Sequence, residues 1–445
     1  MMRRIVSTRQ WIQGKSKSAK GKSEKAESSS SSSHRSSSSH RSLLFALFLL
    51  PFSFFLLPSA QAQVAVRGET VHTMAGASIR DGVVLIRAGK IERVGAASAV
   101  QIPSGYRTIT ARVVTPGLID AHTVVGLSGF MNQPHDQMQV ERSSPIQPEL
   151  RAIDAYDARE RLVEWLRGLG VTTIHTGHGP GSLISGQTMI VKTVGDEVEQ
   201  AVVVPSAMIA ATLGEGALVT GNRSPGTHAK EFAMLRGEFL KAQEYERKQT
   251  TAKDDQKPSR DLRMEALGRV LKGELPLLVT VHRAHNIISV LRLAKEFNIR
   301  VVLDGAAESY LVAEQIKAAN VPVIVHPTMF RATGETENLS METASLLRRA
   351  GIPVALQSGF ENYVPKTRVV LFEAAVAAAN GLNFNEALSA VTIDAARLLG
   401  ISNRVGSLEA GKDADLALFD GDPFEYTTHV TGVIINGQVV SDTAR

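Results

Sequence analysis

From residue 115 onwards the chain alternates between apolar residues at helical spacing and short, continuous apolar runs. The clearest helical stripe consists of Leu162, Val163, Leu166 and Leu169. Gly170 follows it as a helix-ending residue, and residues 171–174 form a strand-like run. The same order returns three times, with strand-like runs at residues 299–303, 321–325 and 352–356. Runs that are apolar throughout are typical of a parallel sheet covered on both faces.

Repeated helix–strand units of this length predict an α/β protein, either a doubly wound sheet or a (β/α)8 barrel. The roughly 290 residues from 115 to 404 fit a barrel with insertions. One insertion, residues 241–263, is highly charged and predicts a solvated helix and loop.

Strand patterns replace the helical pattern at both ends of this region. Residues 82–86 form a β-branched run, residues 433–435 form an apolar one, and Asn436-Gly437 is the strongest two-residue hairpin signal. A chain that begins and ends in strands around a barrel can pair them in one small composite domain. We therefore predict four parts, namely a leader at 1–62, a first β-segment at 63–114, a barrel at 115–404 and a second β-segment at 405–445.

Composition narrows the class of protein. The 445 residues are 43% hydrophobic and include no cysteine, which excludes a disulfide scaffold, a thiolate metal site and wholesale disorder. The net charge of +5 comes from 49 basic and 44 acidic residues, of which residues 1–62 hold 10 and 2. The remaining 39 basic and 42 acidic residues carry a net charge of −3, so the body gives no reason to expect nucleic-acid binding.

The leader has the pattern of a secretory signal peptide. Residues 1–42 are basic and serine-rich, residues 43–57 are almost wholly apolar, and Ala60-Gln61-Ala62 is a small-x-small cleavage site. We expect cleavage after Ala62, so that the exported protein, periplasmic or secreted, begins at Gln63. An uncleaved membrane anchor is the alternative, and N-terminal sequencing of the exported form separates the two. No later segment reaches about 18 uninterrupted apolar residues, so we expect no stable membrane span after cleavage.

Two sequence motifs carry a family resemblance. Residues 114–122 read VTPGLIDAH and residues 405–416 read VGSLEAGKDADL. The first resembles the first barrel strand of the amidohydrolase superfamily and the second its return segment, most closely in the imidazolonepropionase-like branch. The resemblance covers essentially all of residues 64–445. It implies a metal-bearing (β/α)8 TIM barrel flanked by a composite β-sandwich, to which the segments 63–114 and 405–445 would both contribute.

The metal ligands that the resemblance implies are only partly present. In the family, two His at i and i+2 end the first strand; His122 matches the first, and Val124 stands at the second. His282 matches the strand-five His. Gly305 stands where strand six would supply a His. The eighth strand, which in the family supplies an Asp, has none, and Glu361 is the nearest carboxylate and hence the candidate catalytic base.

A zinc site needs three or four protein ligands. We therefore expect at most one divalent metal ion, zinc being the expected metal, held by His122 and His282 with a helper, or no metal at all. The helper candidates are Glu361, His178 and Asp304. The other histidines at strand ends or in nearby loops, which are weaker candidates for lining a site, are His135, His175, His285 and His326.

Two functions from different classes stay open. One is a hydrolase that acts on non-peptide carbon–nitrogen bonds, including cyclic amides, by metal-activated water with a carboxylate base. The other is a catalytically inactive binding or scaffold protein that keeps the fold without the metal site. Both predict a small-molecule substrate or ligand, and the sequence does not define an oligomeric state.

Overall fold

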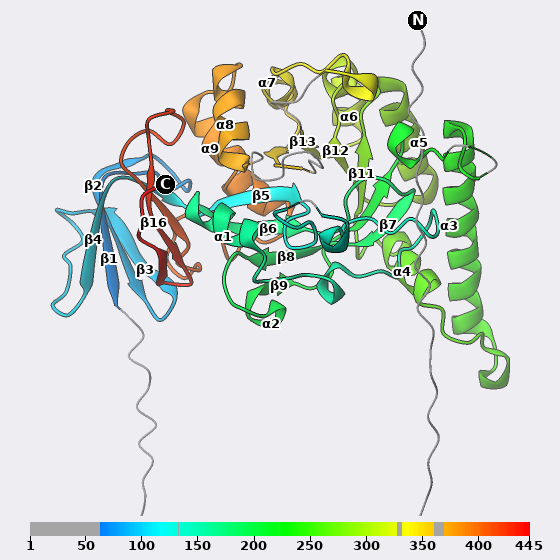
Figure 1. Cartoon of the computed structure of the whole chain (residues 1–445), viewed down its shortest axis with the longest axis horizontal. Helices are drawn as coiled ribbons and strands as arrows, with labels where there is room; N and C mark the ends of the chain where they lie inside the picture. The colour runs from blue at the N-terminus through cyan, green and yellow to red at the C-terminus, as the bar shows by residue number, and fades with distance from the viewer. Residues whose placement is uncertain (1–62, 132, 220, 222, 327–331, 360–368) are drawn as a thin grey trace, which may run out of the picture. The chain divides into compact units, whose positions relative to one another are not determined.

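The computed structural model describes residues 63–445 except 132, 220, 222, 327–331 and 360–368 (Figure 1). The expected signal peptide and Glu361 lie outside the described residues. Within the described part, no helix is both long enough and apolar enough to cross a membrane.

The two ends of the described chain share one sheet. Its strand order is β17-β16-β15-β4-β1-β2-β3. The blue and red strands of Figure 1 accordingly lie side by side. The sheet consists of β1 (Val64–Val71), β2 (Ile79–Arg87), β3 (Lys90–Ala96), β4 (Arg107–Pro116), β15 (Leu416–Phe419), β16 (Val430–Ile435) and β17 (Gln438–Ser441). The two chain ends meet where β15 pairs antiparallel with β4, with Leu416 opposite Pro116. The exact domain boundaries stay a prediction.

Alternating side chains cover both faces of this sheet. Val64, Val84 and Ile86 belong to a buried cluster on one face, and Ala65 and Val83 to a smaller cluster on the other. Because successive strand residues point to opposite faces, two apolar clusters follow directly from the nearly continuous apolar runs.

The α/β region contains a run of parallel strands. These are β10 (Ile209–Thr212), β11 (Leu277–Val281), β12 (Val301–Gly305), β13 (Val323–Val325) and β14 (Val354–Leu356). Each pairs in parallel with the next, and every residue of β11 to β14 is buried. A second sheet starts with β5 (Leu118–Thr123) and β6 (Val171–Thr176), also parallel.

The described strands do not form one uninterrupted parallel barrel. On one side, Gly359 N donates to the carbonyl of His122 at 3.1 Å and joins the segment after β14 to β5. On the other side, β7 (Ile184–Gln187), β8 (Met189–Lys192) and β9 (Val202–Val204) intervene between β6 and β10. Here β8 runs antiparallel to β6 and β7 antiparallel to β10. A regular (β/α)8 ring is therefore not confirmed in detail, because among the described residues a β-segment takes the place of the helical connection after β6.

Helices surround the parallel strands, and their ends follow capping rules. In α5, Asn298 ends the helix in the left-handed conformation that asparagine tolerates. Asp261 begins α4 by accepting from the backbone N–H groups of Arg263 and Met264. The helices are α1 (Arg161–Gly168), α2 (Val198–Ala201), α3 (His228–Thr251), α4 (Leu262–Leu271), α5 (Ala284–Phe297), α6 (Ala313–Ala318), α7 (Thr343–Arg349), α8 (Val370–Ala379), α9 (Phe384–Ala390) and α10 (Ile393–Leu398).

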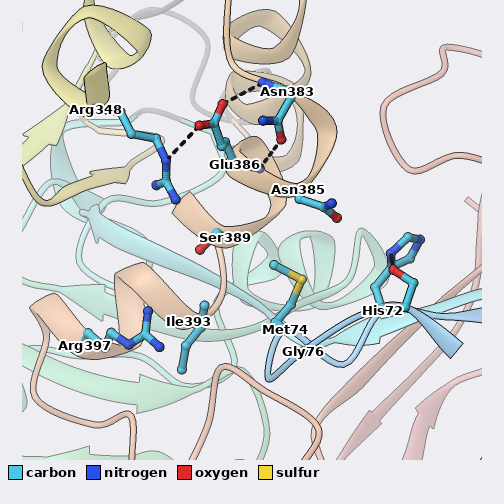
Figure 2. A pocket seen from close by; sticks show the side chains of 11 residues that line it. His72, Met74, Gly76, Arg348, Asn383, Asn385, Glu386, Ser389, Ile393 and Arg397 are labelled. Atoms are coloured by element: carbon cyan, nitrogen blue, oxygen red, sulfur yellow. Dashed lines mark hydrogen bonds and ion pairs between the residues drawn. The ribbon is translucent and has the colours of Figure 1, made fainter. Parts of the chain in front are cut away.

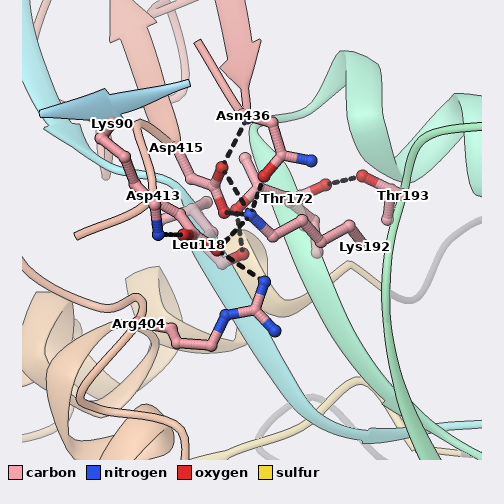
Figure 3. Close-up of polar contacts among 10 residues, drawn as sticks. Lys90, Leu118, Thr172, Lys192, Thr193, Arg404, Asp413, Asp415 and Asn436 are labelled. Atoms are coloured by element: carbon pink, nitrogen blue, oxygen red, sulfur yellow. Dashed lines mark hydrogen bonds and ion pairs between the residues drawn. The ribbon is translucent and has the colours of Figure 1, made fainter. Parts of the chain in front are cut away.

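A buried ionic cluster joins the barrel to the return segment, as Figure 3 shows. Lys192 at the end of β8 lies 2.8 Å from Asp413 and 3.0 Å from Asp415, and it also donates to the side chain of Asn436. The carboxylate of Asp413 also contacts Lys90 and Arg404. The return segment, residues 405–416, is therefore bound by Lys192, which lies 221 positions before Asp413.

The ionic cluster predicts a stability change at acidic pH. Burial opposes ionisation of Asp413, but the hydrogen bonds from Lys192 and Lys90 outweigh it and lower its pKa to about 2. At a pH between about 2 and 3.8, the ordinary pKa of an aspartate, Asp413 is protonated to a greater extent in the unfolded chain than in the folded one. The stabilisation from Asp413 is thus present above about pH 4 and lost as the pH falls towards 2, on the order of 2 kcal/mol. In urea unfolding from pH 5 to pH 2, the stability difference between wild type and Asp413→Asn should narrow; a constant difference would contradict the assignment.

Candidate functional site

A cavity of about 110 Å³ lies at the carboxyl ends of the barrel strands, the end at which barrel enzymes carry their active sites. Its residues come from β5, β11 and β12 and from the positions directly after β11, β13 and β14. They are His122, Pro180, Thr280, His282, Asp304, Gly305, His326, Thr336, Gln357 and Gly359. The structure therefore brings together four of the residues singled out from the sequence, namely His122, His282, Asp304 and the weaker candidate His326.

The central feature of the cavity is a buried histidine–aspartate pair. His122 Nδ1 lies 2.9 Å from Asp304 Oδ1, and both side chains are 4% exposed. Burial works against a charged imidazole, but the nearby carboxylate of Asp304 outweighs it and raises the pKa of His122. The other ring nitrogen of His122, Nε2, is buried, and no described residue forms a hydrogen bond with it.

Asp304 accepts hydrogen bonds from two further side chains. Thr280 Oγ1 donates to Asp304 Oδ2 at 2.5 Å, and Gln357 Nε2 donates to Asp304 Oδ1 at 2.6 Å. Burial alone would raise the pKa of Asp304, but His122 and these donors hold it at about 2. The sequence reasoning missed Thr280 and Gln357. Strand alternation offers a signal for Thr280, because it lies two residues before His282 and so faces the same side.

Two glycines explain the shape of the cavity. Gly305 stands where the resemblance implies a histidine, and a Cβ there would lie 2.6 Å from the Cε1 of His282. A Cβ on Gly359 would lie 2.7 Å from the Nε2 of His326. The imidazoles of His282 and His326 thus occupy space that side chains at positions 305 and 359 would need.

The contact at Gly305 gives a testable prediction. Gly305→Ala should lower the free energy of unfolding by about 1–3 kcal/mol, because the new methyl group meets His282 in a backbone conformation with φ of +75°. Gly400→Ala is the matched control, because Gly400 has a φ of +73° and no atom within 4 Å of its added Cβ. Chemical unfolding of both variants isolates the contact. Equal losses would show that His282 does not occupy this space.

Four of the other candidate histidines, unlike His326, do not line the cavity. His175 Nδ1 donates to the Ala121 carbonyl at 2.7 Å, its Nε2 forms a hydrogen bond with Thr188 Oγ1 at 2.6 Å, and burial lowers its pKa to about 3. His178, a proposed helper ligand, is buried against Gly186, and burial lowers its pKa to about 4. His135 and His285 are exposed.

Asp120 is a further buried carboxylate that the sequence reasoning passed over, although it lies inside the first motif. It accepts from the backbone N–H groups of Ser358 at 2.9 Å and His122 at 3.3 Å, and from the Ser358 hydroxyl. Burial raises its pKa to about 7, against these hydrogen bonds. Asp120 therefore ties the segment after β14 to β5 and fixes the backbone beside His122.

The described residues do not show the complete ligand set of the metal centre that the resemblance implies. Within the described residues, no group of three or more His, Asp or Glu side chains is arranged to hold a metal ion. Both oxygens of Asp304 already accept hydrogen bonds from side chains, and His122 Nδ1 is bound to Asp304. The cavity is lined by the imidazoles of His122, His282 and His326, and the helper candidate Glu361 lies outside the described residues. That the chain binds at most one divalent ion stays a prediction.

A second pocket of about 360 Å³ lies near His72, and Figure 2 shows its lining. Its two arginines already have carboxylate partners, of which Glu386 lines the pocket and Asp394 does not. Arg348 lies 2.8 Å from Asp394 and 3.5 Å from Glu386, and Arg397 lies 3.0 Å from Asp394. With its charges paired internally, this pocket presents no unbalanced charge to a ligand, and the cavity at the strand ends is the stronger candidate.

Comparison with known proteins supports the family assignment. Residues 358–440 match the model of the amidohydrolase family. The chain is 26% identical to an imidazolonepropionase of Rhizobium rhizogenes, over 80% of this chain and 91% of that protein. It is 25% identical to amidohydrolase tasK of Hapsidospora irregularis, over 81% of this chain but only 40% of that longer protein.

A solved structure agrees with these relatives. The amidohydrolase from Thermotoga maritima MSB8 matches with a TM-score of 0.79 and 27% identity, over 85% of this chain and all of that one. The chain belongs to the amidohydrolase superfamily, as its two motifs predicted. The solved structure implies a TIM barrel with a β-sandwich as the overall architecture. This chain departs from a regular barrel in the β7–β9 segment.

Proposed function

We propose that this protein is a hydrolase that cleaves a non-peptide carbon–nitrogen bond of a small molecule in the cavity around His122. The single observation that carries the proposal is the buried His122–Asp304 pair at the catalytic end of the barrel: both residues line the cavity, and no described residue forms a hydrogen bond with the second ring nitrogen of His122. A carboxylate-held imidazole is a competent general base for adding water to an amide carbon. Membership of a family whose relatives include an imidazolonepropionase supports the substrate class.

The dimensions of the cavity favour a small substrate. A volume of about 110 Å³ accommodates the reacting group of a small amide or ring and not a polypeptide segment. Its described lining contains three histidines, the carboxylate of Asp304, hydroxyl- and amide-bearing side chains, two glycines and Pro180, and it has no Met, Phe, Tyr, Trp, Lys or Arg that would extend a binding groove. We therefore place cyclic and short linear amides first among the candidates.

A non-catalytic binding barrel is the second candidate function. The observation that favours it is the loss of three donors in a chain that otherwise keeps the family motifs, with Val124, Gly305 and Gly359 at the positions concerned. In this case the cavity would bind the same class of small amide without cleaving it, because a fold can persist after the residues that catalyse its reaction are lost.

Turnover of defined compounds tests the proposal. The purified full chain is incubated with a panel of lactams, cyclic ureas, imidazolones and N-acyl amines, and the release of carboxylate is followed by chromatography. We expect cleavage of at least one class, with His122→Gln inactive and His429→Gln fully active. His429 is the matched control because it forms a comparable pair with Asp420 at 3.0 Å on the surface. Saturable binding of a panel compound without cleavage would favour the second candidate.

The metal content should be measured on the same preparation of purified protein. Elemental analysis of the purified chain gives the number of divalent ions per chain, and we expect no more than one. Two equivalents would show that the chain holds a pair of ions despite the substituted positions.

A further inference from the structure

We infer that this protein has a second binding site, for a small amphipathic carboxylate, between α5 and α6 at the amino ends of the barrel strands. The site is a pocket of about 1030 Å³ that includes Val301 and Val302 at the start of β12. The cavity around His122 instead includes Asp304 and Gly305, at the end of the same strand. The two sites thus lie at opposite ends of the barrel and share no lining residue, so the inference does not depend on the proposed hydrolase.

Small side chains on the two helices keep this α5–α6 pocket open. Ala294 of α5, Ala318 at the end of α6 and the following Ala319 line it with methyl groups only. Such side chains fill little of the space between two helices and the strand beneath them, so a gap stays over the start of β12. Ile288 and Leu291 of α5 line the same gap and are only half-buried. The pocket therefore offers apolar surface that the body of a ligand can cover.

The charged side chains in the described lining of the pocket are all basic. They are Arg292, Lys295 and Arg300, and the lining includes no aspartate or glutamate. Among the described residues none of the three forms an ion pair, and Arg300 donates only to the backbone carbonyl of Glu274, at 3.1 Å. Lys295 lies in the last turn of α5, where a cation also stabilises the helix end. Arg292 and Arg300 therefore carry the inference.

The other arginine-lined pockets described in the structure contain their own carboxylates. The pocket near His72 includes Glu386. The surface pockets around Arg67 and around Arg263 include the carboxylates that pair with these arginines. The chain after residue 62 also has more acidic than basic residues, 42 against 39. A pocket with three cations and no carboxylate is thus not an average sample of this surface, and the missing counter-charge points to an anionic ligand.

The apolar and basic groups of α5 lie on one face of the helix. Four lining residues follow the spacing i, i+3, i+4 and i+7 of such a face: Ile288, Leu291, Arg292 and Lys295. Glu296, the acidic residue of this helix, is turned instead towards α3, where it pairs with Arg236 at 2.8 Å. This arrangement places cations directly beside the apolar surface, as a molecule with an apolar body and an anionic head requires.

Volume and donor geometry define the class of ligand. Small-molecule sites commonly have about 300–1,000 Å³ and are mostly apolar, with a few polar groups that orient the ligand. The α5–α6 pocket matches the upper end of this range, so its ligand has an extended apolar body. The guanidinium groups of Arg292 and Arg300 present paired N–H donors that fit the two oxygens of a carboxylate. The ligand is accordingly an aliphatic or aromatic carboxylate.

Isothermal titration calorimetry of the full chain with sodium octanoate tests the site. Octan-1-ol has the same apolar body without the charge, and sodium acetate has the head without the body. We expect one saturable equivalent of octanoate, binding of octan-1-ol that is about tenfold weaker, and no measurable binding of acetate. Equal affinities for octanoate and octan-1-ol, or no octanoate binding at millimolar concentration, would overturn the inference.

Substitutions locate the binding within the molecule. The double variant Arg292→Gln, Arg300→Gln should lower the affinity for octanoate by about tenfold or more and leave that for octan-1-ol unchanged. Ala318→Leu should weaken both, because its larger side chain fills the pocket. The matched control is Arg67→Gln, Arg112→Gln, since these arginines line another pocket but pair with Asp81 and Glu69. An unchanged affinity in the first variant, or an equal loss in the control, would contradict the assignment.

Discussion

Replacing Lys192 with methionine should lower the free energy of unfolding by about 3–5 kcal/mol. The ammonium group of Lys192 is 3% exposed and lies between the carboxylates of Asp413 and Asp415, each about as deeply buried. Methionine keeps most of the apolar stem of the side chain, so that the loss of packing is small. The main loss is charge compensation, because two buried carboxylates then face one another without the cation between them.

The effect should fall most heavily on Asp415. Asp413 keeps two other cations, Lys90 at 2.5 Å and Arg404 at 2.9 Å, whereas among the described residues Asp415 forms an ion pair with Lys192 alone. Burial already raises the pKa of Asp415 with Lys192 in place. In Lys192→Met the group should therefore take up a proton, and the variant should recover part of its stability at acidic pH.

Chemical unfolding in urea measures the loss, and Lys90→Met is its matched control. Lys90 contacts the same carboxylate of Asp413, but its side chain is 52% exposed. An exposed ion pair contributes less than about 1 kcal/mol, so the control should be nearly as stable as the wild type. Similar losses in the two variants would mean that burial of Lys192 is not what makes the cluster strong.

Much of the fold was accessible from periodicity. The apolar runs at residues 299–303, 321–325 and 352–356 lie over β12, β13 and β14, because a buried parallel strand has to be apolar on both faces. The segment after β6 was not accessible in the same way. Residues 184–192 form the short strands β7 and β8, and a run of four residues does not reveal which neighbour it pairs with or in which direction. Only the packed structure shows that β8 runs antiparallel to β6.

The candidate site was also only partly predictable from the sequence. Residue type and strand ends indicated His122, His282 and Asp304, because carboxyl ends of barrel strands converge on one face. Their roles depended on contacts between distant residues. Asp304 lies 182 positions after His122, and only the packed structure shows that its carboxylate contacts His122 and Thr280. His178 shows the converse, since it follows a strand as the others do but packs against Gly186, away from the cavity lining.

The losses in kcat/KM caused by His122→Gln and Asp304→Asn should not be additive as free energies. Once a panel compound is found to be cleaved, we expect each single substitution to lower kcat/KM by about 10²–10⁴-fold, the usual contribution of a general base. His122→Gln removes the proton acceptor itself. Asp304→Asn leaves the ring in place but takes away the carboxylate that fixes the proton on Nδ1, so that the wrong tautomer can face the cavity.

The double variant is the decisive measurement, because two residues that act as one unit can be lost only once. It should be no slower than His122→Gln alone, within about threefold, and the pH–rate profile of Asp304→Asn should shift while that of the surface control His429→Gln stays as in the wild type. A structural role for Asp304 would instead lower activity by reducing the fraction of folded protein, with an unaltered pH profile. Effects that multiply in the double variant would assign the two residues to separate steps, and the proton acceptor would then have to be sought elsewhere among the cavity residues, with His282 the nearest alternative.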